Sequence, residues 1–295
     1  MSPEEEESAA LQPPAISVVI GSLNRFEFLK ATIDSVRSEL AQEESEIIVV
    51  DGGSDDGSLD WLVEQKDVMT IIQYNRGSWN GQDLPRRSWG YFMNIAFRAS
   101  STPLVCMLSD DCLVVPGAIR NGMKVLASNG KLGAVAFYWR NWPEEDKYSV
   151  GYSFGDRMFV NHGIFRAQAL RDVDYIDADN YAFYHADGDL GQRMWEAGWE
   201  CAASPSSFVE HFSHANPRQR AANRLVASQD WSEYESRWKH LGMPKRDWHR
   251  ISHDDQFETA ESEWGPLSRR DRLSLRGRLV FRRLLNASAK RFSRS

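Results

Sequence analysis

The sequence lacks the long apolar runs and the cysteine patterns that mark membrane and secreted proteins. No uninterrupted apolar stretch approaches the roughly 20 residues of a membrane-spanning helix. The first residues, MSPEEEESAALQPP, are acidic where a secretory signal would be basic. The three cysteines, Cys106, Cys112 and Cys201, fit neither a zinc site nor a disulfide framework. We therefore expect buried free thiols in a cytoplasmic protein that contacts a membrane, if at all, at its inner face.

An excess of positive charge is also missing, because the 295 residues carry a net charge of −7. This balance argues against general nucleic-acid binding. Positive charge is concentrated in the last part of the chain, RRDRLSLRGRLVFRRLLNASAKRFSRS, where apolar residues are interleaved with arginines. Two interpretations of this basic tail, residues 269–295, remain open: an amphipathic helix on an anionic membrane, or a solvated chain end.

What is present is a pattern of short β-branched runs that alternate with helical patterns over residues 16 to about 132. This alternation is typical of β-α-β units around a mostly parallel sheet. The predicted strands are ISVVI, EIIVVD, VMTIIQY and PLVCML. A helix is expected after the first strand, and another after Pro116. We predict a disordered acidic N-terminus over residues 1–14, one α/β domain over 15–215, and a helical C-terminal region with the basic tail over 216–295.

Polar residues follow three of these strands, in the segments GSLNR, DGGSDDGS and SDDC. In open α/β sheets, ligands bind beyond the carboxyl ends of the strands. Asp51 at the end of the second strand could accept hydrogen bonds from a nucleobase or a ribose. The alternative is a polar turn that caps a helix at Ser58.

Two adjacent carboxylates, Asp110 and Asp111, follow PLVCML with no basic residue beside them in the sequence. A divalent cation with oxygen ligands would relieve their repulsion and could hold a diphosphate. Paired acids in a turn are also common without any metal.

Further candidates lie in the second half of the chain. Asp187 and Asp189, in HADGDLGQRMWEAGW, are either a helix cap or a source of a general base. His211 and His214, in PSSFVEHFSHAN, could complete the ligand set of an acidic metal site, form a two-histidine zinc site, or be structural. Trp139 and Trp142, in FYWRNWPEED, could stack on an acceptor sugar or belong to the core.

Taken in chain order over residues 16 to 216, these motifs resemble the family 2 glycosyltransferases of the GT-A class. ISVVIGSLNR is similar to the family's opening strand and turn, VVDGGSDDGS to its nucleotide-binding turn, and MLSDDC to its Asp-x-Asp metal motif, with Ser109 in place of the first acid. The segment ending in HADGDLG resembles the family's E-D-x-D-L motif, with Ala186 in place of the glutamate. The resemblance implies a GT-A Rossmann-like, mostly parallel sheet flanked by helices, with a helical C-terminal appendage.

The resemblance also implies roles for individual residues. Asp187 takes the catalytic-base position, while Asp189 caps or orients the following helix. Asp111 and His211 take the positions that bind a divalent metal, Mn2+ or Mg2+, with His214 as the second choice for the histidine. The nucleotide-binding positions are Ser22, Asn24, Arg25, Asp51, Gly53 and Asp110.

The function implied is metal-assisted, inverting transfer of a sugar from a UDP-, GDP- or dTDP-type donor to a hydroxyl group of a glycan or lipid-linked acceptor. Such an enzyme would serve the biosynthesis of cell-surface glycans or polysaccharides. Ser109 and Ala186 at two acidic positions leave an alternative, a catalytically silent scaffold that binds nucleotide or glycan. A sugar-nucleotide pyrophosphorylase is disfavoured because no glycine-rich, basic loop opens the chain.

Overall fold

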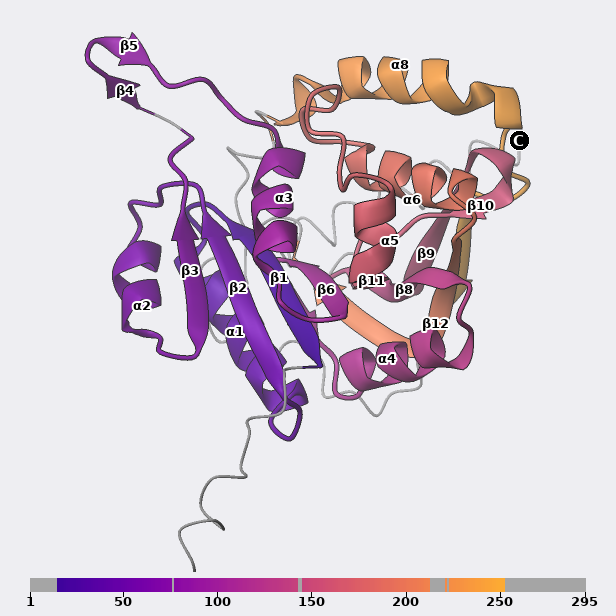
Figure 1. Cartoon of the computed structure of the whole chain (residues 1–295), viewed down its shortest axis with the longest axis horizontal. Helices are drawn as coiled ribbons and strands as arrows, with labels where there is room; N and C mark the ends of the chain where they lie inside the picture. The colour runs from indigo at the N-terminus through magenta and orange to yellow at the C-terminus, as the bar shows by residue number, and fades with distance from the viewer. Residues whose placement is uncertain (1–14, 76, 143–144, 213–220, 222, 253–295) are drawn as a thin grey trace, which may run out of the picture.

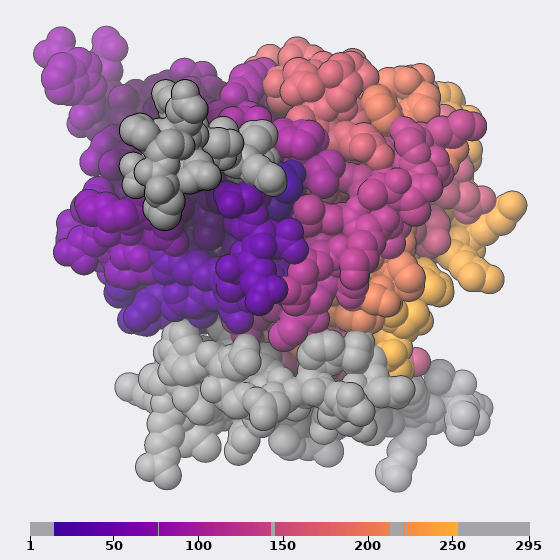
Figure 2. Space-filling model, turned by 60° about the horizontal axis from the view of Figure 1, so that its bottom comes forward, coloured from indigo at the N-terminus to yellow at the C-terminus, as the bar shows by residue number. Residues whose placement is uncertain are grey.

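The fold is given by a computed structural model, which describes residues 15–75, 77–142, 145–212, 221 and 223–252. Within these residues, eleven strands form one mixed sheet in which the order β10-β9-β8-β11-β6-β1-β2-β3 is the main path. Figures 1 and 2 show the N-terminal half and the second half packed side by side in one body. A small hairpin, β4 (Ser78–Trp79) and β5 (Gln82–Asp83), projects from that body in both views.

The first half of the sheet is parallel. It consists of β1 (Ile16–Ser22), β2 (Ser45–Asp51), β3 (Val68–Ile72) and β6 (Leu104–Ser109). The register pairs Ser22 with Asp51 and Gly21 with Ser109, so the carboxyl ends of β1, β2 and β6 meet at one edge. This edge carries the three polar segments singled out in the sequence.

Helices cover both faces of the parallel strands, which explains why these strands are apolar on both sides. Val18 and Ile20 of β1 pack with α1 (Phe26–Glu39), whereas Val19 packs with α3 (Trp89–Ala99). The short α2 (Ser58–Glu64) connects β2 to β3.

The second half of the sheet mixes both pairings. Strand β12 (Glu200–His211) runs parallel to β8 (Leu132–Asn141) and antiparallel to β7 (Cys112–Val114), which places His211 opposite Cys112. The remaining strands are β9 (Tyr148–Ser153), β10 (Arg157–Met158), β11 (Gly163–Arg166) and β13 (Trp248–Ile251). The helices of this half are α4 (Ala118–Ser128), α5 (Ala167–Asp172), α6 (Ala186–Glu196) and α8 (Ala227–Trp238), with 3-10 turns η1 (Phe154–Asp156) and η2 (Lys239–Leu241).

The predicted α/β fold with flanking helices is confirmed. The four predicted strands correspond to β1, β2, β3 and β6, and helices follow β1 and Pro116 as expected. Parallel pairing extends over β3-β2-β1-β6 and β8-β12, and the other pairs of the sheet are antiparallel. A C-terminal helix, α8, is present.

The structure tests only some of the predictions about the chain ends, the domain boundaries and the cysteines. The acidic N-terminus and the basic tail lie outside the described residues, and the boundaries 15–215 and 216–295 stay predictions. The three cysteines are buried and free. In the part of the chain that the structure describes, no helix combines the length and apolarity that crossing a membrane requires.

Candidate active site

A pocket of about 390 Å³ opens at the carboxyl ends of the parallel strands. We call it the strand-end pocket. Its walls come from the turns after β1, β2, β3 and β6 and from the segment before α3. Two later parts of the chain, residues 178–183 and residues 223, 226 and 229, complete the walls. The lining residues used below are Ser22, Arg25, Asn75, Arg86, Ser109, Asp110, Tyr181 and Asn223. Ligand binding at this edge is the behaviour expected of open α/β sheets.

The turn after β2 is built around the buried Asp51 carboxylate. Its Oδ1 accepts hydrogen bonds from the backbone N–H groups of Gly53 (2.8 Å) and Ser54 (2.7 Å), and its Oδ2 accepts one from Ser54 Oγ (2.7 Å). Gly53 has a φ of 91°, and a Cβ there would lie 2.5 Å from the Tyr74 ring, so glycine is required. Asp51 therefore holds the turn in shape.

The same turn is joined to the turn after β1. The backbone N–H of Asn24 donates to Ser54 Oγ (2.8 Å), and the Asn24 amide oxygen accepts from the N–H of Asp55 (2.9 Å). Of the residues predicted to bind nucleotide, Ser22, Arg25 and Asp110 line the pocket, and Asn24, Asp51 and Gly53 form the turns that carry it. Contact of Asp51 with a nucleobase stays a prediction.

Arg25 neutralises the paired carboxylates at the end of β6. Its Nη1 lies 2.6 Å from Asp110 Oδ1 and 2.7 Å from Asp111 Oδ2. Burial raises the pKa of Asp110 to about 6. Burial also acts on Asp111, but Arg25 and His211 outweigh it and hold the pKa of that carboxyl below its usual range. No basic residue lies beside the pair in the sequence, but the fold brings Arg25 to it from 85 residues earlier in the chain.

His211 lies on the other side of Asp111. Its Nδ1 is 3.1 Å from the amide oxygen of Asn141, which makes Nδ1 the protonated nitrogen and directs Nε2 to Asp111 Oδ1 at 3.4 Å. Asp111 Oδ1 is buried and makes no hydrogen bond with the described residues. Asp111 Oδ1 and His211 Nε2 thus face each other, and a proton or a metal cation between them would stabilise the arrangement.

This donor set fits a hard divalent cation that shares its ligands with a substrate. Mg2+ and similar ions are commonly held by one or two side chains together with phosphate oxygens and water. The described ranges contain no group of three or more Asp, Glu, His or Cys side chains that could hold a metal on their own. Asp111 and His211 are therefore suited to a site that a diphosphate completes. His214, the second choice, lies outside the described residues.

Ser109, at the position of the missing first acid, contacts a histidine that the sequence analysis did not single out. Its Oγ lies 3.1 Å from Nε2 of His162, and Cys112 Sγ lies 3.3 Å from the same nitrogen. Burial lowers the pKa of His162 to about 3, so this imidazole is neutral. A carboxylate at position 109 would here face a buried, uncharged ring.

The two tryptophans predicted on the acceptor side lie away from the pocket lining. Trp142 is 8% exposed and packs with Leu113 and Phe212. Trp139 packs edge-on against His211, with ring centroids 5.7 Å apart. Neither residue lines the strand-end pocket or the second cavity described next.

A second cavity of about 200 Å³ contains Asp187 in its wall. We call it the aromatic cavity, because Tyr152, Phe154, Phe159, His185, Trp231, Tyr234 and Trp248 also line it. Asp187 lies in the first turn of α6, where its Oδ1 accepts from the N–H of Gly188 (2.9 Å). Burial raises the pKa of Asp187 and lowers that of the neighbouring His185. A carboxylate with a raised pKa is suited to accept a proton.

Asp189 has different surroundings. It is fully buried, and it accepts hydrogen bonds from Arg193 Nε (2.6 Å), Trp238 Nε1 (3.0 Å), Arg237 Nη1 (3.1 Å) and the Tyr181 hydroxyl (3.3 Å). The first three donors belong to α6 and α8, so the carboxylate joins the two helices. Its contacts are those of a structural residue, in line with the helix-orienting role that the resemblance implies.

The strand-end pocket and the aromatic cavity share two segments of chain. Residues 178–183 line the pocket and residues 185, 187 and 188 line the cavity. In the second segment, residues 223, 226 and 229 line the pocket, and residues 231 and 234 line the cavity. The buried Asp230 fixes the two segments to each other, because its carboxylate accepts from the N–H groups of Ala182 (2.9 Å), Phe183 (2.9 Å) and Tyr184 (2.8 Å). The two spaces therefore neighbour one another.

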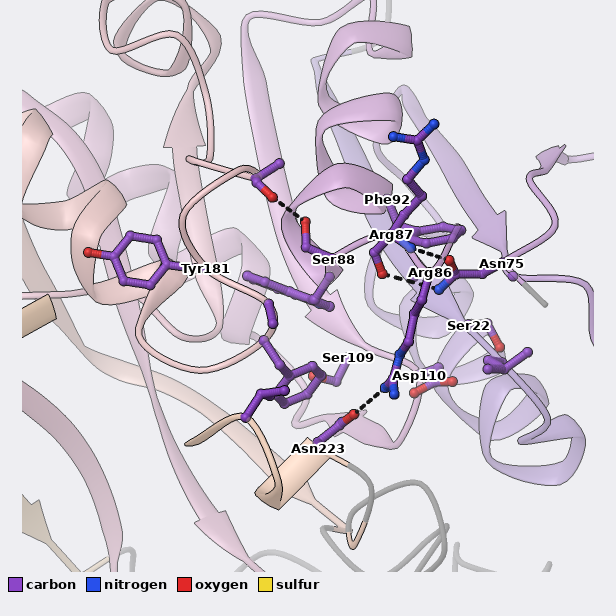
Figure 3. A pocket seen from close by; sticks show the side chains of 18 of the residues that line it. Ser22, Asn75, Arg86, Arg87, Ser88, Phe92, Ser109, Asp110, Tyr181 and Asn223 are labelled. Atoms are coloured by element: carbon purple, nitrogen blue, oxygen red, sulfur yellow. Dashed lines mark hydrogen bonds between the residues drawn. The ribbon is translucent and has the colours of Figure 1, made fainter. Parts of the chain in front are cut away.

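Arg86 is a pocket residue that the sequence analysis missed. Figure 3 shows its side chain extending toward Asn223, with which Nη2 forms a hydrogen bond of 3.2 Å, whereas Arg87 extends the opposite way. The signal available in the sequence was the pair of arginines in LPRRSWG, directly before an apolar helical pattern. Asn75, whose amide bonds to the backbone of Arg87, gave no such signal.

Comparisons with known proteins agree with this geometry. The profile of Glycosyl transferase family 2 matches residues 17–190, more than half of the chain, so the chain belongs to this family. A comparison with curated protein sequences gives no match.

Solved structures show the same fold. The chain is similar to the mannosyltransferase PcManGT from Pyrobaculum calidifontis, solved with GDP-Man and Mn2+, with a TM-score of 0.57 and 16% identity over 77% of this chain and 64% of that one. It is also similar to S. aureus TarS 1–349, with a TM-score of 0.51 and 12% identity over 77% of this chain and 74% of that one. A UDP complex of the same TarS fragment matches with a TM-score of 0.51 and 12% identity, over 74% and 68% of the two chains. These similarities confirm the predicted GT-A fold, and this chain spans 64% of the length of the mannosyltransferase.

Proposed function

We propose that this chain transfers a sugar from a nucleoside diphosphate-sugar in the strand-end pocket to a hydroxyl group of an acceptor in the aromatic cavity. The observation that carries the proposal is the position of Asp187. This carboxylate has a raised pKa and lies on the segment that runs from one space to the other. A base at that position can reach an acceptor hydroxyl while the donor stays in the neighbouring pocket.

The donor diphosphate would bind near Arg25 and Arg86. Charge-assisted hydrogen bonds from guanidinium groups to phosphate oxygens are among the stronger polar contacts in proteins. Ser22 and Asp110, with the turn that Asp51 holds, would shape the space for the ribose and base. The GDP-Man in PcManGT and the UDP in TarS support a nucleotide ligand for this fold.

Asp111 and His211 would hold a divalent cation, Mn2+ or Mg2+, beside that diphosphate. When bound, such an ion neutralises negative charge on the departing nucleoside diphosphate. The 3.4 Å separation of Asp111 Oδ1 and His211 Nε2, two atoms that can both be metal ligands, supports this assignment. The Mn2+ in PcManGT supports it as well.

Asp187 would remove the proton of the acceptor hydroxyl as that oxygen attacks the anomeric carbon of the donor sugar. A single displacement of this kind inverts the configuration at that carbon. General-base assistance is typically worth about 10²- to 10⁴-fold in rate. Asp189 is held by four donors and would take no part in the proton transfer.

A catalytically silent scaffold is the second candidate, favoured by Ser109 and Ala186 at two positions where the family carries acids. Calorimetric titration with UDP-, GDP- and dTDP-sugars, with and without Mn2+, followed by an assay of donor hydrolysis, separates the two. We expect binding of one nucleotide class that Mn2+ strengthens, together with slow donor hydrolysis. Metal-dependent binding without hydrolysis or transfer to any offered acceptor would support the scaffold. Absence of nucleotide binding would refute the transferase and the nucleotide-binding scaffold.

Titration of an Arg86→Gln variant shows whether the nucleotide-sugar binds in the strand-end pocket. Loss of one charge-assisted contact should weaken donor binding about 10- to 100-fold. Arg98→Gln is the matched control, because Arg98 is exposed and lies 3.7 Å from Asp174, outside the pocket lining. Equal effects of the two variants would contradict the placement of the donor.

For the pathway, we propose a role in the biosynthesis of cell-surface glycans or polysaccharides, with a glycan or lipid-linked acceptor reached at the inner face of the membrane. The basic tail, residues 269–295, would supply the membrane contact. Sedimentation with anionic liposomes, comparing the full chain with a chain that ends at residue 268, tests this part. Equal binding by both chains would refute it.

A further inference from the structure

The aromatic cavity differs from the strand-end pocket in charge. The described residues that line the cavity include no lysine or arginine and do include two acids, Asp187 and Asp247. Three arginines, Arg25, Arg86 and Arg87, line the strand-end pocket. A phosphate or carboxylate group would be repelled by the acids of the cavity and would find no cation there. The chemistry of the cavity therefore favours an uncharged ligand.

Two partly exposed indole rings give the cavity flat apolar faces. Trp231 and Trp248 are each 38% exposed, although large aromatic side chains are usually well buried. Trp231 packs against Phe154 in a stacked arrangement with ring centroids 6.1 Å apart, and Trp248 packs edge-on against Phe159 at 6.3 Å. Both rings are thus held in place while part of their surface stays open. The open CH-rich face of a pyranose ring is complementary to such a surface.

Glycines permit the close approach that forms these walls. A Cβ on Gly151 of β9 would lie 2.4 Å from Phe159 and 3.2 Å from Trp248, and a Cβ on Gly188 would lie 3.0 Å from the Tyr234 hydroxyl. Side chains at these two positions would displace Phe159 and crowd Trp248 and Tyr234, which line the cavity. The shape of the aromatic cavity therefore depends on glycine at these two positions.

The walls also come from a part of the chain beyond the family match. Trp231 and Tyr234 belong to α8 and Trp248 belongs to β13, all after residue 190 where the match ends. The family profile therefore does not determine what this cavity binds. Specificity for the acceptor would be set by these C-terminal elements.

We propose that the aromatic cavity binds an uncharged pyranose ring, the terminal sugar of a glycan acceptor, against Trp231 and Trp248, with one hydroxyl group directed to Asp187. This inference rests on the proposed function. It excludes acceptors whose terminal unit is a phosphorylated polyol, a sugar phosphate or a uronic acid.

The test uses saturation-transfer NMR of the full chain with two sets of small glycosides. The neutral set is the methyl glycosides of glucose, galactose, mannose and N-acetylglucosamine. The anionic set is methyl glucuronide, glucose 6-phosphate and glycerol 3-phosphate. We expect at least one neutral glycoside to bind at millimolar concentration, with saturation on its ring protons, and the anionic set to bind more weakly.

Variants show whether the binding occurs in the cavity. Trp231→Ala and Trp248→Ala should each weaken binding of the neutral glycoside about tenfold, and Trp231→Phe should retain most of it. Trp79→Ala is the control, because Trp79 is 80% exposed on the β4–β5 hairpin. Calorimetric binding of UDP or GDP to each variant confirms that it has folded.

Three results would overturn the inference: no neutral glycoside binds, the anionic set binds better, or the tryptophan variants bind as well as the wild type. Nucleotide binding by the wild-type chain shows whether only the inference about the acceptor fails or the proposed function fails as well. If nucleotide binds and glycoside does not, only the inference about the acceptor is wrong. If nucleotide fails to bind, the proposed function is wrong as well.

Discussion

Arg25 and Asp111 form a buried ion pair in which Nη1 lies 2.7 Å from Oδ2, and the same nitrogen lies 2.6 Å from Asp110. Asp110 and Asp111 are only 4% and 2% exposed, so water does little to screen their interaction with Arg25. Arg25 follows β1 directly, so the ion pairs link the end of β1 to the carboxylates at the end of β6.

Replacement of Arg25 by methionine should therefore destabilise the protein. Removal of one partner of a buried ion pair typically lowers the free energy of unfolding by about 3–5 kcal/mol. Urea unfolding measures the loss, and Arg98→Met, at an exposed ion pair, should change the free energy by less than about 1 kcal/mol. Adding Asp110→Asn to the Arg25 variant should restore part of the stability. A loss equal to that of Arg98→Met would contradict the importance of this pair.

Loss of His211 should remove the effect of metal on nucleotide binding. In the wild-type chain, we expect Mn2+ to raise the affinity for a nucleoside diphosphate measured by calorimetry. His211→Ala should abolish that increase, and Asn141→Ala, which removes the partner of His211 Nδ1, should weaken metal binding about 10- to 100-fold. His240→Ala, at an exposed histidine, serves as the control. A Mn2+ effect that persists in His211→Ala would show that other ligands hold the ion.

Asp187 and Asp189 should respond in opposite ways to the same substitution. Asp189→Asn removes the charge that holds Arg193 and Arg237, so the free energy of unfolding should fall by about 3 kcal/mol. Asp187→Asn removes a carboxylate whose charge is disfavoured by burial, so stability at neutral pH should be unchanged or higher. Urea unfolding of both variants measures the contrast. Equal destabilisation would mean that Asp187 is also a structural residue.

The pH dependence of activity should report the environment of Asp187. A general base acts in its ionised form, and burial raises the pKa of this carboxyl above its ordinary value of 3.8. Activity should therefore fall as pH is lowered through that raised pKa, with the acidic limb of the kcat/KM profile above the ordinary pKa of an aspartate. An acidic limb at or below the ordinary value would count against Asp187 as the base.

The sequence predicted the parts of this molecule that rest on local patterns. The β-branched runs of β1, β2, β3 and β6 and the polar residues at their ends follow from short-range rules, and the structure brings Asp111 and His211 together as the resemblance implied. The ion pair between Arg25 and Asp110 joins positions 85 residues apart, which no local pattern reveals.

The aromatic cavity could not be predicted for a related reason. Trp231 and Trp248 are separate aromatic residues in polar segments, and only the packing of α8 and β13 against β9 and α6 brings them to Asp187. Asp230 was equally hidden, because its acceptor role depends on the backbone of a loop almost fifty residues earlier. Tertiary contacts of this kind form the aromatic cavity, where we propose that the acceptor binds.

We propose that Asp187 provides the base for sugar transfer from a donor bound in the strand-end pocket. Turnover of the nucleotide-sugar that the titrations identify, measured with saturating donor for the wild type and Asp187→Asn, tests this role most directly. We expect the variant to bind donor with unchanged affinity and to turn over about 10²- to 10⁴-fold more slowly. Full activity of Asp187→Asn would contradict it.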